Sequence, residues 1–513
     1  MEDLLKYLKK EREQEWRVEL RNNLKNKERT QMERNPMPEQ DPDKRNKNFL
    51  EVNEGLSEEQ AILEAKRCID CPSPTCITGC PVGINIPKFI KKIEAGEFLE
   101  AASVLKETNA LPAVCGRVCP QEVQCEQVCF YTQKLGKPAV GIGNLERFAA
   151  DYERNSGKIS VPEIPAKNGI KVASIGSGPA GLAFAGDMAK MGYDVTVFEA
   201  LHEIGGVLKY GIPEFRLPNS IVDVEIDNLE KMGVKFVNNF IVGKTATIED
   251  LKKEGYTAFL VASGAGLPNF MHIPGENFIG IYSSNEYLTR VNLMNAADPE
   301  YDTPVLSGRN VAVIGGGNTA MDSVRTAKRL GAERAMIIYR RSIEEMPARK
   351  EEIKHAKEEG IEFLNLHNPV EYFADENGRV NQIKVQKMKL GEPDASGRRR
   401  PIPIKGSEYT IDVDTVVVSV GVSPNPLIPQ NMKELEVSSW GTIIVDKDTL
   451  QSSIPDVFAG GDIVRGGATV ILAMGDGRRA AAAMDRHIKA KVRDILMLIK
   501  EFKTIGDVLE FAK

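Results

Sequence analysis

All eight cysteines of this chain lie between residues 68 and 129, in two runs of four. The first run reads C-x2-C-x4-C-x3-C and is followed by Pro81, and the second reads C-x3-C-P-x4-C-x3-C. An iron–sulfur cubane needs four soft anionic ligands that converge on one cluster, and a ligand from a distant run often completes the set. The spacing therefore favours two [4Fe–4S] clusters in the N-terminal region of the chain.

Two other uses of these cysteines are weaker. A pair of structural zinc sites would also take four thiolates each, but zinc knuckles favour two C-x2-C pairs and one such pair occurs here. A disulfide framework suits small secreted domains. This chain has 513 residues and opens on a charged segment rather than on a signal peptide, so we do not expect disulfides.

The composition describes an ordinary globular protein and excludes some partners. The net charge is -6, and no sustained basic face is predicted, so nucleic acid is not an expected partner. No uninterrupted apolar run reaches transmembrane length, so no membrane partner is expected. Oxygen-sensitive clusters and free thiolates fit a reducing compartment, which predicts a cytoplasmic location.

The N-terminal third of the chain is expected to be helical. Residues 1–35 are dense in Lys, Arg and Glu, which is typical of a solvated helix or flexible tail, and alternatively of a docking arm for another subunit. Residues 58–67 and 87–109 lack the alternation of a strand and predict helices. The range 87–109 predicts two short helices that are separated near Gly96. This region therefore reads as an all-α domain with cluster loops at helix ends.

From residue 170 the pattern changes to strand, glycine turn, helix and strand. Gly176-x-Gly178-x-x-Gly181 follows an apolar strand, and Glu199 closes the next strand about twenty residues on. Such glycines permit a tight turn and close approach of a pyrophosphate to a helix N-terminus, and the carboxylate suits ribose hydroxyls. We expect FAD here, with further contacts from Pro179, Ala180, Gly205 and Gly206.

A second unit of this kind begins at Arg309. It carries Gly315-x-Gly317-x-x-Ala320, which includes Asn318 and Thr319, but its second strand ends in Arg340 and Arg341 instead of an acid. A carboxylate there would repel a 2′-phosphate, whereas guanidinium groups bind one bidentately. The pair therefore favours NADP(H) over NAD(H). The alternative is that both are ordinary surface arginines at a strand end.

A later glycine-rich stretch suggests that the flavin domain is split. Asp462 follows Gly461 and is expected to reach the ribityl chain and pyrophosphate of the flavin. A helix that opens near Ala468 and Thr469 would direct backbone N–H groups at the flavin N1–C2=O edge. The alternative is an ordinary glycine-rich turn before a core helix.

Together these patterns predict an α/β fold with an all-α N-terminal iron–sulfur domain and two Rossmann-like dinucleotide-binding domains, the NADPH domain being inserted in the FAD domain. The expected segments are a charged extension (1–35), the two-cluster domain (36–165), a first FAD-binding segment (166–296), the NADPH-binding domain (297–426), a second FAD-binding segment (427–490) and a C-terminal helix (491–513).

With these residues in view, the chain resembles the small-subunit (beta) family of NADPH-dependent glutamate synthase. That family includes the large subunit of the ferredoxin-dependent NADH:NADP transhydrogenase, which is electron-bifurcating, and the sulfide dehydrogenase flavoprotein. The likeness covers roughly residues 36–490 and is strongest in CIDCPSPTCITGCPVGINIP, CGRVCPQEVQCEQVC, IGSGPAGLAFA, GGGNTAMD, EMPARKEE and FAGGDIVRG.

The resemblance implies one FAD, two [4Fe–4S] clusters and a site for NADP(H). It implies that cluster 1 is held by Cys68, Cys71, Cys76 and Cys129. It implies that cluster 2 is held by Cys80, Cys119, Cys125 and Glu146, and the spacing leaves Cys115 open as the alternative fourth ligand.

We expect an oxidoreductase in which NADPH, FAD and the clusters carry the chemistry, so no catalytic side chain is predicted. The expected partner is another oxidoreductase subunit. If it is the glutamate synthase large subunit, that subunit must carry out the glutamine chemistry. A glutamine amidotransferase of the N-terminal-nucleophile kind needs an exposed cysteine, and every cysteine here lies in a cluster run. Alternatives are the NADPH-side subunit of a bifurcating transhydrogenase or hydrogenase-like complex, paired with a ferredoxin-NAD reductase-like flavoprotein and with ferredoxin, a sulfide dehydrogenase, and a non-enzymatic electron-transfer or assembly module with vestigial nucleotide sites.

Overall fold

The structure is a computed structural model that describes residues 2–395 and 397–501. The chain forms two compact units, and each is assembled from separate segments of the sequence. The first unit comprises Met1–Ser160, Gly205–Glu225 and Ala265–Ser423, and the second comprises Val161–Ile204, Ile226–Gly264 and the chain from Pro424 onward. In the described residues, no helix combines the length and the apolar character needed to cross a membrane.

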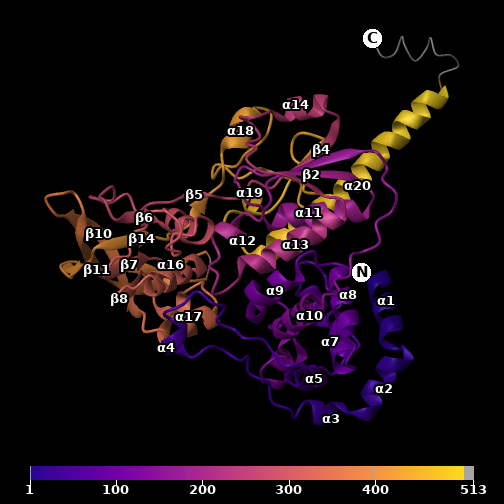
Figure 1. Ribbon diagram of the computed structural model, residues 1–513, viewed down its shortest axis with the longest axis horizontal. Coiled ribbons are helices and arrows are strands. Elements are labelled where there is room, and N and C mark those ends of the chain that lie inside the picture. Colours follow the sequence, from indigo (N-terminus) through magenta and orange to yellow (C-terminus); the bar gives the residue numbers. More distant parts are fainter. Residues whose placement is uncertain (1, 396, 502–513) are drawn as a thin grey trace. The chain divides into compact units, whose positions relative to one another are not determined.

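The N-terminal region of the first unit is all-α, as predicted. Figure 1 shows α5, α7, α9 and α10 grouped together, with α1, α2 and α3 beside them. Gly96 has φ 79° and separates α7 from α8, as the sequence indicates. The elements are α1 (Glu2–Arg12), α2 (Glu15–Asn23), α3 (Asn26–Arg29), α4 (Pro42–Arg45), α5 (Glu58–Lys66), α6 (Thr75–Thr78), α7 (Ile86–Glu94), α8 (Phe98–Lys106), α9 (Pro112–Val118), the 3-10 turn η1 (Gln121–Val123), the π turn η2 (Tyr131–Leu135) and α10 (Ile142–Ser156).

Close helix packing holds this domain together. On α7, Phe89, Ile90 and Ile93 are buried on one face, as the spacing of apolar residues requires. Helices α9 and α10 approach so closely that a Cβ added at Gly116 would lie 2.5 Å from the backbone nitrogen of Arg147. This approach brings Cys115 of α9 against the helix that carries Glu146.

The second unit is built on a parallel sheet with the order β16-β4-β1-β2-β3. Its last strand in sequence, β16, pairs with β4, so the chain leaves this sheet and returns to it, and the predicted insertion is confirmed. The elements are β1 (Lys171–Ile175), α11 (Pro179–Lys190), β2 (Asp194–Phe198), β3 (Lys235–Val237), α14 (Ile248–Lys253), β4 (Tyr256–Val261), α18 (Leu427–Asn431), β16 (Val457–Ala459), α19 (Asp462–Arg465) and α20 (Val470–Glu501); α13 (Asn219–Lys231) spans both units.

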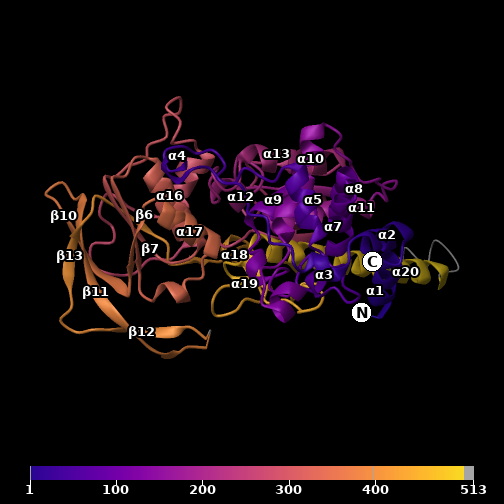
Figure 2. The same ribbon diagram turned by 90° about the horizontal axis from the view of Figure 1, so that it is seen from below.

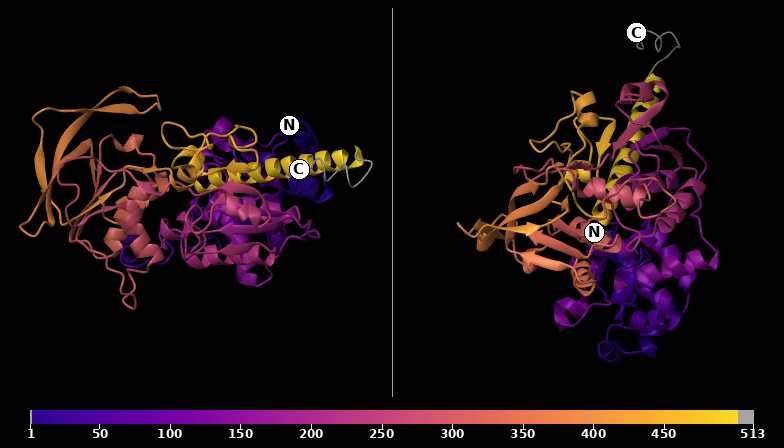
Figure 3. Two further views of the ribbon diagram at one scale, coloured as in Figure 1. Left: turned by 90° about the horizontal axis from the view of Figure 1, so that it is seen from above. Right: turned by 60° about the vertical axis from the view of Figure 1, so that its left-hand side comes forward.

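Helix α20 is one continuous helix, the long yellow helix in Figure 3, and it packs against α11. A Cβ added at Gly477 would lie 2.1 Å from the carbonyl oxygen of Ala180, so the two helices meet at a position that only glycine fits. The C-terminal helix predicted for 491–513 is described as far as Glu501, and residues 502–513 lie outside the described residues.

The rest of the first unit holds a second parallel sheet and an antiparallel one. The parallel sheet has the order β6-β14-β7-β8-β9, and the strands β10 to β13 form the antiparallel sheet visible in Figure 2. The elements are α12 (Val207–Tyr210), β5 (Leu267–Pro268), β6 (Ile281–Ser283), α15 (Ser284–Leu288), the π turn η3 (Thr289–Leu293), β7 (Asn310–Ile314), α16 (Asn318–Arg329), β8 (Arg334–Tyr339), η4 (Ile343–Glu345), α17 (Lys350–Glu358), β9 (Glu362–Asn365), β10 (His367–Ala374), β11 (Val380–Pro393), β12 (Arg399–Pro403), β13 (Tyr409–Asp412), β14 (Thr415–Val418) and β15 (Val422–Ser423).

One strand lies in a different sheet from the one the sequence indicates. Strand β6 falls inside the predicted first FAD-binding segment (166–296), yet it pairs in parallel with β14 of the second sheet. Its three residues are too few to show a period of their own, so their partner was not readable from the sequence. The chain therefore changes unit near residue 265, within the stretch 259–266 that the sequence suggests as a crossing between the two domains, and not at residue 297.

Candidate functional site

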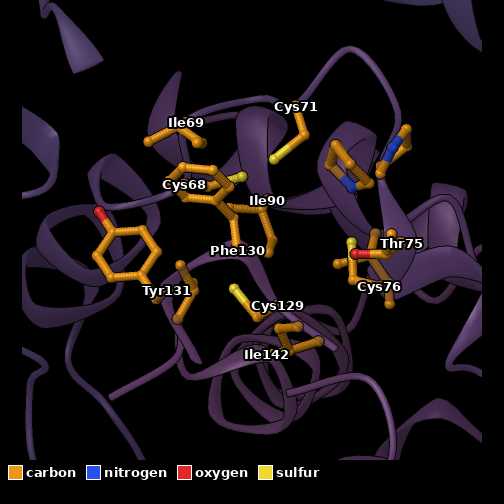
Figure 4. A pocket seen from close by; sticks show the side chains of 14 residues that line it. Cys68, Ile69, Cys71, Thr75, Cys76, Ile90, Cys129, Phe130, Tyr131 and Ile142 are labelled. Carbon is orange, nitrogen blue, oxygen red and sulfur yellow. The ribbon is translucent and has the colours of Figure 1, made fainter. Parts of the chain in front are cut away.

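Four of the cysteines line one pocket in the helical domain. Cys68 and Cys71 lie just after α5, Cys76 lies in α6, and Cys129 lies two residues before the turn η2. Figure 4 shows these cysteines around a shared space bordered by apolar side chains, among them Ile90, Phe130 and Ile142. The structure thus brings together the four residues expected to hold cluster 1.

The chemistry of this pocket fits a metal cluster. Burial raises the pKa of Cys68 and Cys76, and it raises the pKa of Cys71 to about 12, with the neighbouring thiols adding to the effect. The thiols of Cys68, Cys71 and Cys76 therefore stay protonated unless metal cations replace their protons. A thiolate-rich, otherwise apolar pocket is the environment in which cubane clusters are held.

The other four cysteines gather around Glu146. Cys115 lies in α9, Cys119 directly follows the last residue of α9, and their side chains are hydrogen-bonded. The hydrogen bond that Cys119 donates to Cys115, burial and the charge of Glu146 raise the pKa of Cys119, while burial and the Glu146 charge raise the pKa of Cys80 to about 11. Burial and neighbouring charges, Glu146 among them, also raise the pKa of Cys125. The predicted cluster 2 residues and the alternative ligand Cys115 thus lie in one group.

Asn109 is a member of this group that the sequence did not reveal. Its side-chain amide donates to Glu146 Oε1 at 2.8 Å, and its amide oxygen accepts from Cys115 Sγ at 3.7 Å. Burial raises the pKa of Glu146 to about 8, because no cation compensates its charge in the described residues around it. Asn109 follows the polar residues 106–108 and precedes α9, so no local pattern distinguished it from an ordinary helix-end residue.

The first nucleotide fingerprint has the geometry its glycines predict. Gly176 has φ 106°, and an added Cβ would lie 2.4 Å from the carbonyl oxygen of Ala262. A Cβ at Gly181 would lie 2.1 Å from the carbonyl oxygen of Gly176. At Gly178, by contrast, an added Cβ would meet no atom of the described chain within 4 Å. This open position caps α11, which starts at Pro179 and Ala180, so an anion has room at a helix N-terminus.

Glu199 is fixed at the end of β2. Its Oε2 accepts hydrogen bonds from the backbone N–H of Ser177 at 2.9 Å and from the Ser177 hydroxyl at 2.6 Å, and its Oε1 accepts from Leu201 N at 2.9 Å. These bonds orient a buried carboxylate next to the glycine turn. The remaining lone pairs are free to accept ribose hydroxyls.

The loop with Gly461 and Asp462 is held by a residue that sequence reasoning missed. Asp476 of α20 is fully buried and accepts from Gly461 N at 3.0 Å and from the guanidinium groups of Arg465 and Arg479. A lone aspartate in an apolar stretch of helix was the available signal. Asp462 itself accepts from Ala468 N at 3.1 Å, and burial raises its pKa to about 6.

The remaining predicted flavin residues differ in where they lie. Thr469 precedes the first residue of α20, at the helix start that the sequence indicates. Gly205 and Gly206 belong to the first unit, whereas the other predicted flavin residues belong to the second.

The second fingerprint repeats the geometry of the first. Gly315 has φ 143°, and an added Cβ would lie 2.3 Å from the carbonyl oxygen of Ser419. Gly317 caps α16, and an added Cβ there would meet no described atom within 4 Å. Asn318 and Thr319 begin α16, and Ala320, at the third glycine position, is fully buried. The positions expected to approach a pyrophosphate are open in both fingerprints.

The two arginines after β8 have different surroundings. Arg340 is exposed. Arg341 is buried; its Nη2 donates to Asp394 Oδ2 at 2.6 Å, and its Nε donates to the carbonyl oxygen of Arg399 at 2.8 Å. Arg341 therefore ties the β11–β12 hairpin to the end of β8, and Arg340 is the one that presents its guanidinium to solvent.

The EMPARKEE stretch joins the second fingerprint to the cysteine-rich loops. Arg349 donates its backbone N–H to Asn318 Oδ1 at 2.9 Å. Its buried guanidinium donates to the carbonyl oxygen of Arg117 and to Gln121 Oε1, both at 3.1 Å. Gln121 in turn donates to the carbonyl oxygen of Cys115 at 3.3 Å. All of these residues belong to the first unit.

One cysteine-lined pocket, a second group of cysteines and two glycine cradles define an iron–sulfur flavoprotein oxidoreductase, and family models agree. Residues 45–158 match the model "Dihydropyrimidine dehydrogenase domain II, 4Fe-4S cluster", and residues 170–477 match "Pyridine nucleotide-disulphide oxidoreductase". The glutamate synthase [NADPH] small chain of Azospirillum brasilense is 38% identical over 462 residues, which are 89% of this chain and 95% of that relative. The chain belongs to the glutamate synthase small-chain family, and the predicted resemblance is confirmed.

Two further comparisons place this family in a wider group. The NADP(+)-dependent formate dehydrogenase subunit beta of Moorella thermoacetica is 39% identical over 437 residues, which are 81% of this chain and 60% of that protein. FprA from Mycobacterium tuberculosis, solved in complex with NADPH, superposes with a TM-score of 0.54 at 19% identity, covering 67% of this chain and 89% of FprA, which shows a shared fold. The matches support [4Fe–4S], FAD and NADP(H) as the cofactors of this oxidoreductase.

Proposed function

We propose that this chain passes electrons between NADP(H) and a partner oxidoreductase subunit through one FAD and two [4Fe–4S] clusters, most like a glutamate synthase small subunit. The observation that carries the proposal is the presence of two separate cysteine groups and two open glycine cradles in one chain. When bound, FAD supplies the conversion between two-electron hydride transfer and one-electron chemistry, and the clusters supply one-electron relay.

The role of the protein in this chemistry is to bind and orient. The N-termini of α11 and α16 present backbone N–H groups to the two pyrophosphates, with Gly178 and Gly317 leaving the space for them. Glu199 would hold the adenosine ribose of FAD, and Asp476 holds the loop that carries Asp462. Arg340 supplies the cation for the 2′-phosphate.

For the clusters, we propose Cys68, Cys71, Cys76 and Cys129 as one ligand set and Cys80, Cys119, Cys125 and Glu146 as the other. Asn109 supports Glu146 as a ligand, because its amide donates to one carboxylate oxygen and orients the group. Cys115 points to Asn109 and Cys119 instead. An intact second cluster in Cys115→Ser and its loss in Glu146→Ala, measured by iron content and EPR, would support this assignment, and the reverse result would make Cys115 the ligand.

A reciprocal pair of glycine variants tests the nucleotide sites. The backbone at both positions accepts valine, with φ -66° at Gly178 and -90° at Gly317. Under anaerobic conditions we expect NADPH to bleach the flavin absorbance of the parent protein. Gly317→Val should keep its flavin and respond to dithionite but not to NADPH, and Gly178→Val should lose flavin while retaining iron. Equal reduction of Gly317→Val and the parent by NADPH would refute the proposed site.

The physiological partner separates the remaining candidates. A large glutaminase-bearing chain that copurifies without oxygen would support the glutamate synthase function, for which the small-chain relative is the precedent. A smaller ferredoxin-NAD reductase-like flavoprotein would instead support a transhydrogenase-like complex. The formate dehydrogenase beta subunit shows that a similar chain is named as a subunit of another oxidoreductase. We propose a cytoplasmic location, because both cysteine groups need reduced thiols to take up iron.

A further inference from the structure

The N-terminal segment, for which the sequence left the role open, contacts the turn that carries two predicted ligands of cluster 1. Arg12, Arg17 and Arg21 all donate to Asp70, which lies between Cys68 and Cys71. Arg12 Nε donates to the Asp70 carbonyl oxygen at 2.8 Å. Arg21 Nη1 donates to Asp70 Oδ2 at 2.7 Å, and Arg17 Nη2 donates to Asp70 Oδ1.

These contacts hold an unusual turn. Asp70 has φ 51°, a left-handed conformation that non-glycine residues adopt rarely. Its side chain is fully buried, and Arg17 is only 3% exposed, so water screens this pair weakly. In a solvated tail these arginines would be exposed to water, and in a docking arm they would be available to bind another subunit. In this structure they are bonded to the chain's own cluster loop.

A fourth arginine of the segment reaches the same loop. Arg29 is fully buried and donates to the carbonyl oxygens of Lys66 at 2.6 Å and Cys68 at 3.3 Å. It also pairs with Glu94, whose carboxylate is shared with the ammonium of Lys91, and Lys91 donates to the same Cys68 carbonyl oxygen. The carbonyl groups around Cys68 are therefore bonded to buried cations.

The charges near the turn do not cancel. Arg12, Arg17, Arg21, Arg29 and Lys91 are cations, and the buried carboxylates opposite them are those of Asp70 and Glu94. A third carboxylate, that of Glu13, pairs with Arg12 and Arg21, but its side chain is 53% exposed and is screened by water. The surroundings of the loop are thus net positive.

We propose that residues 2–29 act as a resident cationic collar that raises the reduction potential of the cluster held by Cys68, Cys71, Cys76 and Cys129. Reduction adds one negative charge to a cluster, and nearby weakly screened cations favour that charge. Asp70, placed between two ligands, opposes it. This inference rests on the proposed ligand set, and the arginines are positioning residues that act through the Cys68–Cys71 turn.

The test is an EPR-monitored redox titration of the anaerobically purified, cluster-replete protein. Cys71→Ser first identifies the EPR signal of this cluster. Arg21→Gln should lower the potential of that signal, on the order of a tenfold drop in the reduced-to-oxidised ratio at fixed potential, which is about 59 mV for one electron. Asp70→Asn should raise it, and asparagine tolerates the left-handed turn. Arg21→Lys keeps the positive charge, so the reduction potential of this variant should stay near that of the parent protein.

The matched control is Lys27→Gln, which removes an exposed cation from the same segment and should leave the potential unchanged. Opposite shifts for Arg21→Gln and Asp70→Asn support the collar. Equal shifts in one direction, or none, overturn it, because mere loosening of the turn would not change sign with the charge removed. If Arg21→Gln does not retain the cluster, the Asp70→Asn variant decides: a raised reduction potential supports the collar, and a lowered or unchanged one overturns it. If Cys71→Ser alters neither signal, the ligand set itself is wrong, which is a separate failure.

Discussion

Glu359, which directly follows α17, is the carboxylate whose loss should most weaken the first unit. It is 1% exposed and accepts hydrogen bonds from Arg325 at 2.7 and 2.9 Å and from Arg329 at 2.8 and 3.1 Å. Arg45, from α4, donates to it at 3.1 Å. Burial acts to raise the pKa of Glu359, but the bonds and charges of Arg325 and Arg329 outweigh burial and hold it below its usual value.

Glu359→Gln keeps the shape of the side chain and removes the charge that faces these buried arginines. Breaking a buried ion pair from one side costs about 3–5 kcal/mol, because the partner charge stays buried and uncompensated. At about 2 °C per kcal/mol for a unit of this size, the Tm should fall by about 6–10 °C. The measurement is a thermal scan of the holoprotein at a fixed scan rate.

The control is Glu362→Gln. Glu362 also pairs with an arginine in bidentate fashion, at 2.8 to 3.0 Å from Arg334, but the two side chains are 46% and 39% exposed. Such a surface pair contributes less than about 1 kcal/mol. Equal Tm shifts for the two variants would refute the argument that burial of the Glu359 cluster makes it strong.

The pH dependence has a definite sign. A carboxylate with a lowered folded pKa contributes stability that is fully present above its unfolded pKa, 4.5 for Glu359, and is lost as pH falls through the folded value. The difference in Tm between the parent and Glu359→Gln should therefore be full at neutral pH and should shrink as pH falls below about 4.5.

Three other changes have distinct readouts. Arg340→Asp should raise the Michaelis constant for NADPH by about tenfold or more and change that for NADH little, because it removes the cation opposite the 2′-phosphate; no change in steady-state kinetics would exclude this role. Gly477→Val should prevent folding of the second unit, seen as loss of bound flavin, since its side chain would meet the Ala180 carbonyl; a flavin-replete variant would contradict the packing. Asn109→Leu should lower the iron content of the second cluster, measured against the first, by leaving Glu146 unoriented; equal content in both would argue against this support.

Much of this protein was predictable because its signals are local. The glycine fingerprints, the strand that precedes each and the cysteine spacing are each contained in short segments, and steric and coordination rules act on them directly. The close approaches at Gly176 and Gly315 are those the fingerprint demands. The return of β16 to the sheet of the second unit was also predictable. The glycine-rich stretch at Gly461 and Asp462 suggested flavin contacts, although it follows the NADPH-binding domain in the sequence.

The remainder depends on partners that are distant in the sequence. Asp476 bonds to Gly461 through the packing of α20, and no local pattern announces that pairing. Arg341 sits beside Arg340 in a motif that suggests two phosphate-binding arginines, but one of them is taken by the hairpin residue Asp394. Arg17 lies in a run of charges typical of a solvated helix, yet it is buried on a carboxylate 53 residues away. A run of charged residues indicates solvent exposure only on average. A single buried residue within the run, such as an arginine paired with a distant carboxylate, cannot be recognised from the sequence alone.

These distant ion pairs also explain why the first unit is not divided where the cofactor motifs divide the sequence. Arg45 binds Glu359, and Arg216 binds Asp322 at 2.8 Å. The guanidinium of Arg349 bonds to the carbonyl oxygen of Arg117 in α9 and to Gln121, so three separate segments are bonded to one another through buried charge. Buried ion pairs add little net stability over apolar packing, but they penalise any arrangement that leaves a charge unpaired. They therefore favour one arrangement of these segments, and the cysteine loops and the second fingerprint belong to a single compact unit.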